Sequence, residues 1–238
     1  MNRRVQLVLE LQETISTIES GFELLQRDDS WCFREVPCAR LLSDGLERYL
    51  KVTLHLINYA KTGQFLADKA LRNFGHRIDA LWEQVRDKGF DERALSNEFM
   101  VARELNFVAN DPILLRIIEV IALYADASGE YSRYARLNAV ASQFSAQFPD
   151  AVDQGWDDII KRVMQIQSVK EYTDQSWRDI IAPTIIGRIE RFLRLVARAI
   201  YFSDRSREVR SIGSPMMHFL TIKDDDLGGR VYPCFGRS

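Results

Sequence analysis

The sequence predicts an all-α fold, a helical bundle of about seven helices followed by a short tail that resembles a β-hairpin. Apolar residues recur at alternating steps of three and four positions along most of the chain, as on the buried face of a helix. Pro and Gly are scarce, with 6 and 12 residues among 238. Hydrophobic residues make up 46% and charged residues 28%, so the chain has enough apolar material for a core.

The first part of the chain is predicted to form three helices, each with an apolar seam. After the N-terminal helix, the second runs over about 39–62 and the third over about 71–88. Gly63 suits the left-handed position that ends the second helix. The seam positions are Val8, Leu11, Ile15, Ile18, Phe22 and Leu25, then Leu42, Leu46, Leu50, Thr53 and Ile57, then Leu71, Phe74, Ile78, Leu81 and Val85.

Two local signals refine this pattern. Glu47 and Lys51, on the polar side of the second helix, have the spacing of an i,i+4 ion pair. Asp111 and Pro112 form a helix start, because Asp can cap free N–H groups and Pro at the first position gives up a hydrogen bond that the helix does not use. The helix that follows, 113–125, is apolar nearly all round and is therefore expected at the centre of the second half of the fold.

The remaining segments complete the predicted architecture. Further helices are expected over 91–108, 131–148, 156–172 and 177–202, with Pro183 marking a start or a kink in the last one. Two short strands, 216–222 and 230–234, are expected on either side of an acidic, glycine-ended turn. The predicted division is a helical bundle at 1–109, a second helical subdomain at 110–203 and a C-terminal tail at 204–238.

The charge balance and the cysteines bear on location and partners. With 32 basic and 34 acidic residues, the whole molecule has no general attraction to nucleic acid or to anionic membranes. Charged residues interrupt every apolar stretch, and the start of the chain has no signal-peptide pattern, so no membrane span is expected. Three cysteines cannot all pair, which favours reduced thiols in the cytoplasm. We expect no metal and no cofactor, since the sequence has no zinc-site spacing and no Gly-rich phosphate loop.

The candidate catalytic residues lie on the polar side of the third predicted helix. At 100° per residue, His76 falls opposite the apolar seam. Arg72 lies one turn before it, Lys69 and Asp79 share its side, and Glu83 follows. His76 as a general base and Arg72 as a stabiliser of phosphate charge form one hypothesis. The alternative is a solvated helix face with i,i+4 ion pairs.

A second candidate surface lies on the last predicted helix. Between residues 188 and 210 there are seven arginines and three acidic residues. Arg191, Arg194 and Arg198 share the side away from the apolar face, and guanidinium groups suit the recognition of phosphate or carboxylate. The alternatives are a solvated face, or a face paired with acidic residues elsewhere. The segment 131–136 adds two tyrosines and two arginines that could stack on nucleic-acid bases, although its spacing also suits a core helix.

Part of the sequence resembles HEPN-like helical proteins. The matching features are the Glu47 and Lys51 pair, the short linker, the Gly75-His76 and Leu81 spacing, and the segment Tyr131-Ser-Arg-Tyr-Ala-Arg-Leu-Asn138, which is similar to uncharacterised bacterial proteins that carry such a domain. The resemblance implies a helical bundle that forms a homodimer and binds RNA or a partner protein in a defence or toxin–antitoxin role. It also implies, as the alternative, a metal-independent ribonuclease that uses Arg72 and His76. These two lie closer in sequence than the Arg and His of active family members. A purely structural interaction protein is the remaining alternative.

Overall fold

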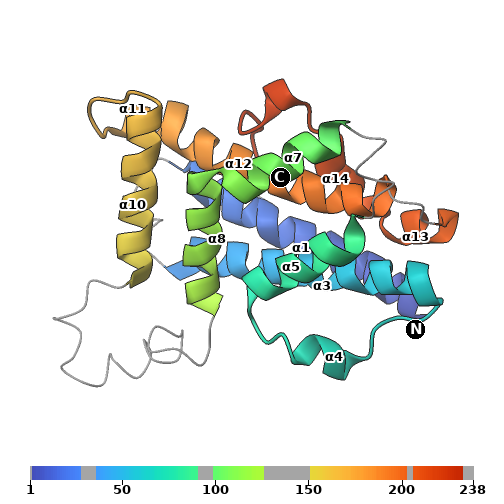
Figure 1. The fold of residues 1–238 in the computed structure, drawn as a ribbon. Helices are drawn as coiled ribbons and strands as arrows, with labels where there is room; N and C mark the ends of the chain where they lie inside the picture. The colour runs from blue at the N-terminus through green and yellow to red at the C-terminus, as the bar shows by residue number, and fades with distance from the viewer. Residues whose placement is uncertain (1, 28–35, 91–98, 126–150, 203–205, 233–238) are drawn as a thin grey trace, which may run out of the picture.

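A computed structural model describes residues 2–27, 36–90, 99–125, 151–202 and 206–232. Within these residues the fold is all-α, as predicted (Figure 1). The long helices are α1 (Arg3–Gln26), α3 (Val36–Thr62), α5 (Ile78–Gly89), α7 (Phe99–Asn110), α8 (Pro112–Ala125), α10 (Ala151–Ile166) and α12 (Ala182–Tyr201). The short elements are α4 (Asp68–Arg72), α11 (Asp174–Ser176), the π-helical turn η2 (Trp177–Ile181), α13 (Arg207–Ile212), η3 (Ser214–Met216), α14 (Met217–Leu220) and η4 (Asp224–Asp226).

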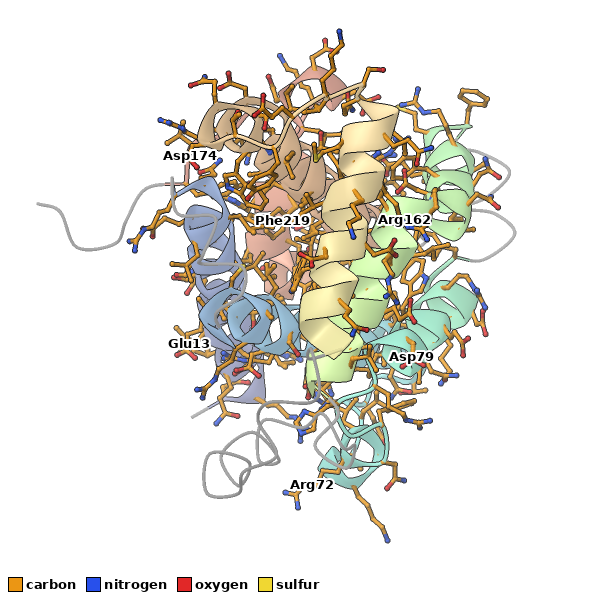
Figure 2. The ribbon with its side chains drawn as sticks, turned by 90° about the vertical axis from the view of Figure 1, so that its left-hand side faces the viewer. Glu13, Arg72, Asp79, Arg162, Asp174 and Phe219 are labelled. Carbon is orange, nitrogen blue, oxygen red and sulfur yellow. The ribbon has the colours of Figure 1, made fainter. Side chains whose placement is uncertain are left out.

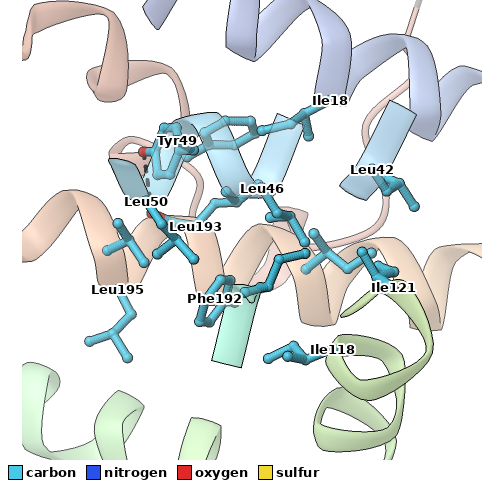
Figure 3. Close-up of a cluster of buried hydrophobic side chains, with 14 of the residues drawn as sticks. Ile18, Leu42, Leu46, Tyr49, Leu50, Ile118, Ile121, Phe192, Leu193 and Leu195 are labelled. Carbon is cyan, nitrogen blue, oxygen red and sulfur yellow. Dashed lines mark hydrogen bonds between the residues drawn. The ribbon is translucent and has the colours of Figure 1, made fainter. Parts of the chain in front are cut away.

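The helices share one hydrophobic core, with α12 inside it. Figure 1 shows α1 running along α3, while α8 and α10 stand beside each other across the end of this layer. Side chains from α1, α3, α8 and α12 meet in the core (Figure 3). Tyr49 is wholly buried there, and its hydroxyl donates to the Leu193 carbonyl oxygen at 3.4 Å. Each large apolar side chain removed from water contributes roughly 1.5–3 kcal/mol, so the seams hold the bundle together.

Several local predictions are confirmed. Gly63 ends α3 with a φ of 72°, and the Asp111 side chain accepts a hydrogen bond from the Leu114 N–H at 2.7 Å at the start of α8. The Lys51 ammonium lies 2.5 Å from the Glu47 carboxylate, as their spacing predicts. The seam of the third predicted helix faces inward: Leu71, Ile78, Leu81 and Val85 are buried, and Phe74 packs on the core.

That third helix is not continuous, and this corrects the predicted placement of His76. The chain forms α4, then a turn, then α5, so His76 lies in the turn and not on a helix face. Gly75 adopts a φ of 56°, a left-handed conformation that interrupts a helix. The Lys51 ammonium donates to the Gly75 carbonyl oxygen at 2.9 Å, which ties the turn to α3.

The predicted hairpin in the tail is wrong. Residues 216–222, expected as a strand, form the end of η3, α14 and a turn. The tail then packs on α12 through Gly228, whose φ is 77° and whose Cβ, if present, would lie 2.0 Å from the Pro183 carbonyl oxygen. The Tyr232 N–H donates to the Gln26 side chain at 3.0 Å. In a hairpin, the backbone after Gly228 would form hydrogen bonds with a partner strand. Here it forms a hydrogen bond with the side chain of a helix residue.

The last predicted helix is interrupted near Pro183. The helix passes from α11 through η2 into α12, and Pro183 occupies the first turn of α12. Proline lacks the N–H that would continue the α-helical ladder, which accounts for the π-helical turn just before it. Residues 91–98 and 131–148, the tyrosine- and arginine-containing segment, Cys32 and Cys234 lie outside the described residues. Among the described helices, none has both the length and the apolar character required to cross a membrane.

Candidate functional site

His76, in the turn between α4 and α5, is held by a carboxylate that reaches it from α3. Its Nδ1 lies 2.6 Å from Glu47 Oε2. An ionised carboxylate only accepts hydrogen bonds. Nδ1 of His76 therefore carries a hydrogen and donates a hydrogen bond to Glu47. Nε2 is then the basic nitrogen, and the His76 side chain is 40% exposed. The ring is oriented on one side and open to a ligand on the other.

Glu47 is itself fixed in place. Its side chain is 10% exposed, and its second oxygen, Oε1, accepts a hydrogen bond from Lys51 Nζ at 2.5 Å. Lys51 also donates to the backbone of the turn that contains His76. We refer to His76, Glu47 and Lys51 as the His76 site. Such an arrangement sets both the tautomer and the direction of an imidazole, which is a requirement for general acid–base catalysis.

His76 lines two hollows of the surface. One, of about 550 Å³, lies between α5, α7 and α8, and the other, of about 690 Å³, lies over α1 and α3. The first is lined by Arg77, Trp82, Arg86, Leu105, Val108 and Leu115, among others. The second is lined by Thr17, Arg40, Leu41, Asp44, Glu47 and Arg48. The imidazole is thus placed where a ligand that spans both hollows would pass.

The cations around the second hollow differ in how firmly they are held. Arg48 is bound by Glu10 at 2.6 Å and by Glu13 at 3.1 Å, and these hydrogen bonds raise the pKa of its guanidinium. Arg40 makes only a loose contact of 3.9 Å with Asp44, and its side chain is mostly exposed. Arg40 is therefore the cation of this hollow with the most freedom to bind an anion.

The two residues predicted to form a catalytic pair lie on different elements, Arg72 at the end of α4 and His76 in the turn that follows. Arg72 lies on α4 and is exposed (Figure 2). Lys69 of the same helix is exposed as well. Among the described residues, no hydrogen bond or ion pair joins Arg72 to His76. Asp79, at the start of α5, is exposed and lines the first hollow. The cation that neighbours His76 in the chain and lines the same hollow is Arg77.

The arginines of α12 also differ from the predicted surface patch. Arg194 is buried and contacts the carboxylates of Glu104 and Asp224, while it donates to the Ile222 carbonyl oxygen at 2.6 Å. Arg198 is buried and lies 3.0 Å from Glu104. The face is thus paired with acidic residues from elsewhere in the chain, one of the interpretations left open by the sequence. Only Arg191 of the three is partly exposed.

The sequence contained a partial signal for the His76 site. The Glu47 and Lys51 pair was evident from its spacing, but nothing in the sequence showed that Glu47 also reaches His76, 29 positions later. His55, on the same helix as Glu47, is buried with its ring edge-on to Phe65.

Comparisons with protein-family models, with curated proteins and with solved structures found no match to this chain. The HEPN-like assignment therefore stays a prediction from the sequence.

Proposed function

We propose that this protein binds RNA across the two hollows and that His76 transfers a proton in metal-independent cleavage of the bound strand. One observation supports this most strongly. A buried carboxylate holds Nδ1 of His76, and Nε2 is left at the surface between the hollows. A carboxylate in this position also stabilises the imidazolium that forms when Nε2 takes up a proton.

The proposed reaction uses the 2′-hydroxyl of the RNA. Nε2 of His76 accepts the hydroxyl proton, the 2′-oxygen attacks the adjacent phosphorus, and the bond from phosphorus to the 5′-oxygen breaks. The leaving oxygen takes a proton from water, which gives a 2′,3′-cyclic phosphate and a free 5′-hydroxyl. Negative charge that develops on the phosphate oxygens needs a nearby cation, and Arg77 and Arg40 border the hollows on either side of His76.

The lining of the first hollow suits a nucleic-acid strand better than a single ion. The first contains Trp82, whose indole is half-buried and meets Phe192 edge-to-face with ring centroids 5.0 Å apart. An aromatic side chain of this kind can stack on a nucleotide base whatever its identity. In this proposal Arg72 and Lys69, exposed on α4, contact the backbone of the strand outside the site and take no part in the chemistry.

The experiment is RNA cleavage in the presence of a chelator. His76→Ala is expected to lower the rate by about 10²- to 10⁴-fold, the usual contribution of a positioned acid–base group. Glu47→Gln should also lower the rate, while Arg72→Gln should change it little. His218→Ala is the matched control, because His218 is also partly exposed and also lies against a carboxylate, 3.0 Å from Glu19. Equal activity of the His76→Ala and His218→Ala proteins contradicts the catalytic proposal.

A second candidate function is the docking of a protein partner, with a second copy of the chain as the simplest case. It is favoured by the apolar lining of the first hollow, where Leu115 of α8 remains 45% exposed. Sedimentation of the wild type against Leu115→Asp separates the two functions. A dimer that dissociates in the variant supports docking, whereas a wild type that stays monomeric at high concentration contradicts it.

A further inference from the structure

We propose a second ligand site, for a small organic anion, in a hollow of about 400 Å³ where Arg191 of α12 faces η2 and the tail. This site does not involve the two hollows at His76 and does not depend on the function proposed for them. Its walls combine charged, polar and apolar groups. They include Arg188, Arg191, Gln167, Thr184, Ile180 and Leu227.

Arg191 differs from the other arginines on its side of α12. Arg188 lies 3.1 Å from Asp111, and Arg194 and Arg198 share Glu104. Arg191 instead packs on the ring of Phe107, with its guanidinium carbon 3.8 Å from the ring centroid. No carboxylate of the described residues lies within ion-pair distance of it. Its Nε is buried without a hydrogen-bond partner in the described structure.

The electrostatics of Arg191 agree with a missing counter-charge. Burial lowers the pKa of its guanidinium, and the more distant Glu104 and Asp224 offset this effect only in part. A cation that has lost water contacts without gaining a carboxylate is stabilised by any anion that enters the hollow. Arg191 lines the hollow, and its Nε has no hydrogen-bond partner among the described residues, so an anion that enters the hollow supplies the charge that burial leaves unbalanced.

The stacking on Phe107 also limits which anions suit the site. A guanidinium is planar, and its contact with the ring restricts its orientation, so it suits a planar or tetrahedral oxyanion that accepts two parallel hydrogen bonds. Ile180, Pro183 and Leu227 provide apolar contacts for the rest of the ligand. Asp179 at the rim, which accepts a hydrogen bond from Gln175 at 2.5 Å, disfavours ligands of high negative charge. The ligand class is therefore a carboxylate or phosphate monoanion with an apolar body.

The π-helical turn is a second feature of this hollow. Asp179 and Ile180, two residues of η2, belong to its lining. Single π-helical turns within α-helices are frequent at functional sites, because they shift the side chains that follow relative to those before. Here the turn brings residues from before and after Pro183 to the same hollow as Arg191.

The test is calorimetric titration of the full chain with benzoate and, separately, with inorganic phosphate. Wild type should bind at least one probe saturably, and Arg191→Gln should bind it about 10- to 100-fold more weakly, the usual effect of losing a charge-assisted contact. Arg191→Lys keeps the charge without the planar fork and should retain part of the affinity. Arg207→Gln, an exposed arginine of α13, should bind as wild type does.

The two probes distinguish a carboxylate ligand from a phosphate ligand. Binding of benzoate alone supports a carboxylate ligand, and binding of phosphate alone supports a phosphate monoester. The proposal is overturned if neither probe binds the wild type up to about 10 mM, a very weak affinity by any standard. It is also overturned if Arg191→Gln, shown by its melting curve to be folded, binds as tightly as wild type. RNA cleavage by this variant should be unchanged, so the two sites are tested independently.

Discussion

Two clusters of charged side chains in this molecule share a design and differ in one respect. In each, a buried carboxylate contacts two cationic or titratable side chains. In the Glu104 cluster, formed by Glu104, Arg194, Arg198 and Asp224, the side chains of both arginines that reach Glu104 are at most 6% exposed. In the His76 site, the imidazole is 40% exposed and the Lys51 side chain 22%. The first cluster is closed, and the second is open on the side of Nε2.

This difference indicates which cluster supports the fold and which can perform chemistry. A charge removed from water is costly, and a closed cluster offsets that cost only while every partner is present. Its three central groups, Glu104, Arg194 and Arg198, are too deeply buried to contact a ligand. An open cluster fixes one side of a titratable ring and leaves the other available, which costs less stability and provides a reactive atom. Stability and activity should therefore respond in opposite ways to substitutions in the two clusters.

The largest effect on stability is expected for Glu104→Gln. Two guanidinium groups contact this carboxylate, and its loss removes the buried negative charge that they share. We expect a loss of about 3–5 kcal/mol in the free energy of unfolding, the range for breaking a buried ion pair from one side. Urea denaturation at neutral pH measures it.

The matched control is Glu119→Gln, an exposed acid 2.7 Å from Arg116 on α8. It should change the free energy of unfolding by no more than about 0.5 kcal/mol. A Glu104→Gln protein as stable as this control would mean that the arginines of α12 do not depend on their buried acid, and the contrast between the clusters would fail.

The Glu104 cluster also marks a limit of what the sequence could predict. The all-α class, the seams and the ends of α3 and α8 follow from local spacing, and they are confirmed. The arginines of α12 were equally visible, but their acids lie about 90 positions before Arg194 and 30 after it. Local periodicity does not report such long-range partners. A row of arginines opposite an apolar seam therefore resembles a solvated or ligand-binding face until the fold is known.

The His76 site was anticipated in part, and for a partly wrong reason. The inward seam of Ile78, Leu81 and Val85 is confirmed, and His76 does avoid the core. The continuous helix that would have placed Arg72 beside it is broken at Gly75. The left-handed φ of this glycine takes His76 off the helix that carries Arg72. Similarly, the positive φ of Gly228 and its contact with Pro183 direct the tail along α12, which the hydropathy of the tail could not indicate.

A smaller loss of stability is expected for Glu47→Gln. The carboxylate is nearly buried, but Lys51 and His76 can turn toward water once it is neutralised. We expect a decrease of about 1–2 kcal/mol in the free energy of unfolding, the range for losing hydrogen bonds to charged groups. The same denaturation series measures it. A loss as large as that of Glu104→Gln would show that the His76 site is closed as well, and the distinction drawn above would no longer hold.

Low pH should reduce the contribution that Asp224, the exposed member of the Glu104 cluster, makes to the free energy of unfolding. Hydrogen bonding from Arg194, and to a lesser extent from Arg103, lowers the pKa of the Asp224 carboxyl. Because this pKa is lower in the folded than in the unfolded chain, the carboxylate stabilises the fold above its ordinary pKa of about 3.9 and loses this contribution as pH falls below that value. Asp224 is nearly half exposed, so the effect should stay below about 1 kcal/mol.

Wild type and Asp224→Asn unfolded by urea at several pH values measure this contribution as a difference. The gap between the two proteins should be constant near neutrality and should shrink between about pH 4 and the lowest pH at which the fold persists. The pKa of Glu190 is raised by burial, so this group acts in the opposite direction, but it is present in both proteins and cancels in the difference. A gap that widens with acid contradicts the assigned role of Asp224.

The smallest effect on stability is expected for His76→Ala, and it is the most informative. The ring is substantially exposed and makes its one hydrogen bond to a carboxylate that Lys51 still satisfies. We expect a change within about 0.5 kcal/mol, similar to His218→Ala, together with the loss of RNA cleavage. A substitution in the closed cluster cannot abolish cleavage while it leaves stability unchanged, because the groups of that cluster affect activity only by stabilising the fold. If His76→Ala instead unfolds as easily as Glu104→Gln, the imidazole is a structural partner of Glu47, and the loss of cleavage in that variant says nothing about catalysis.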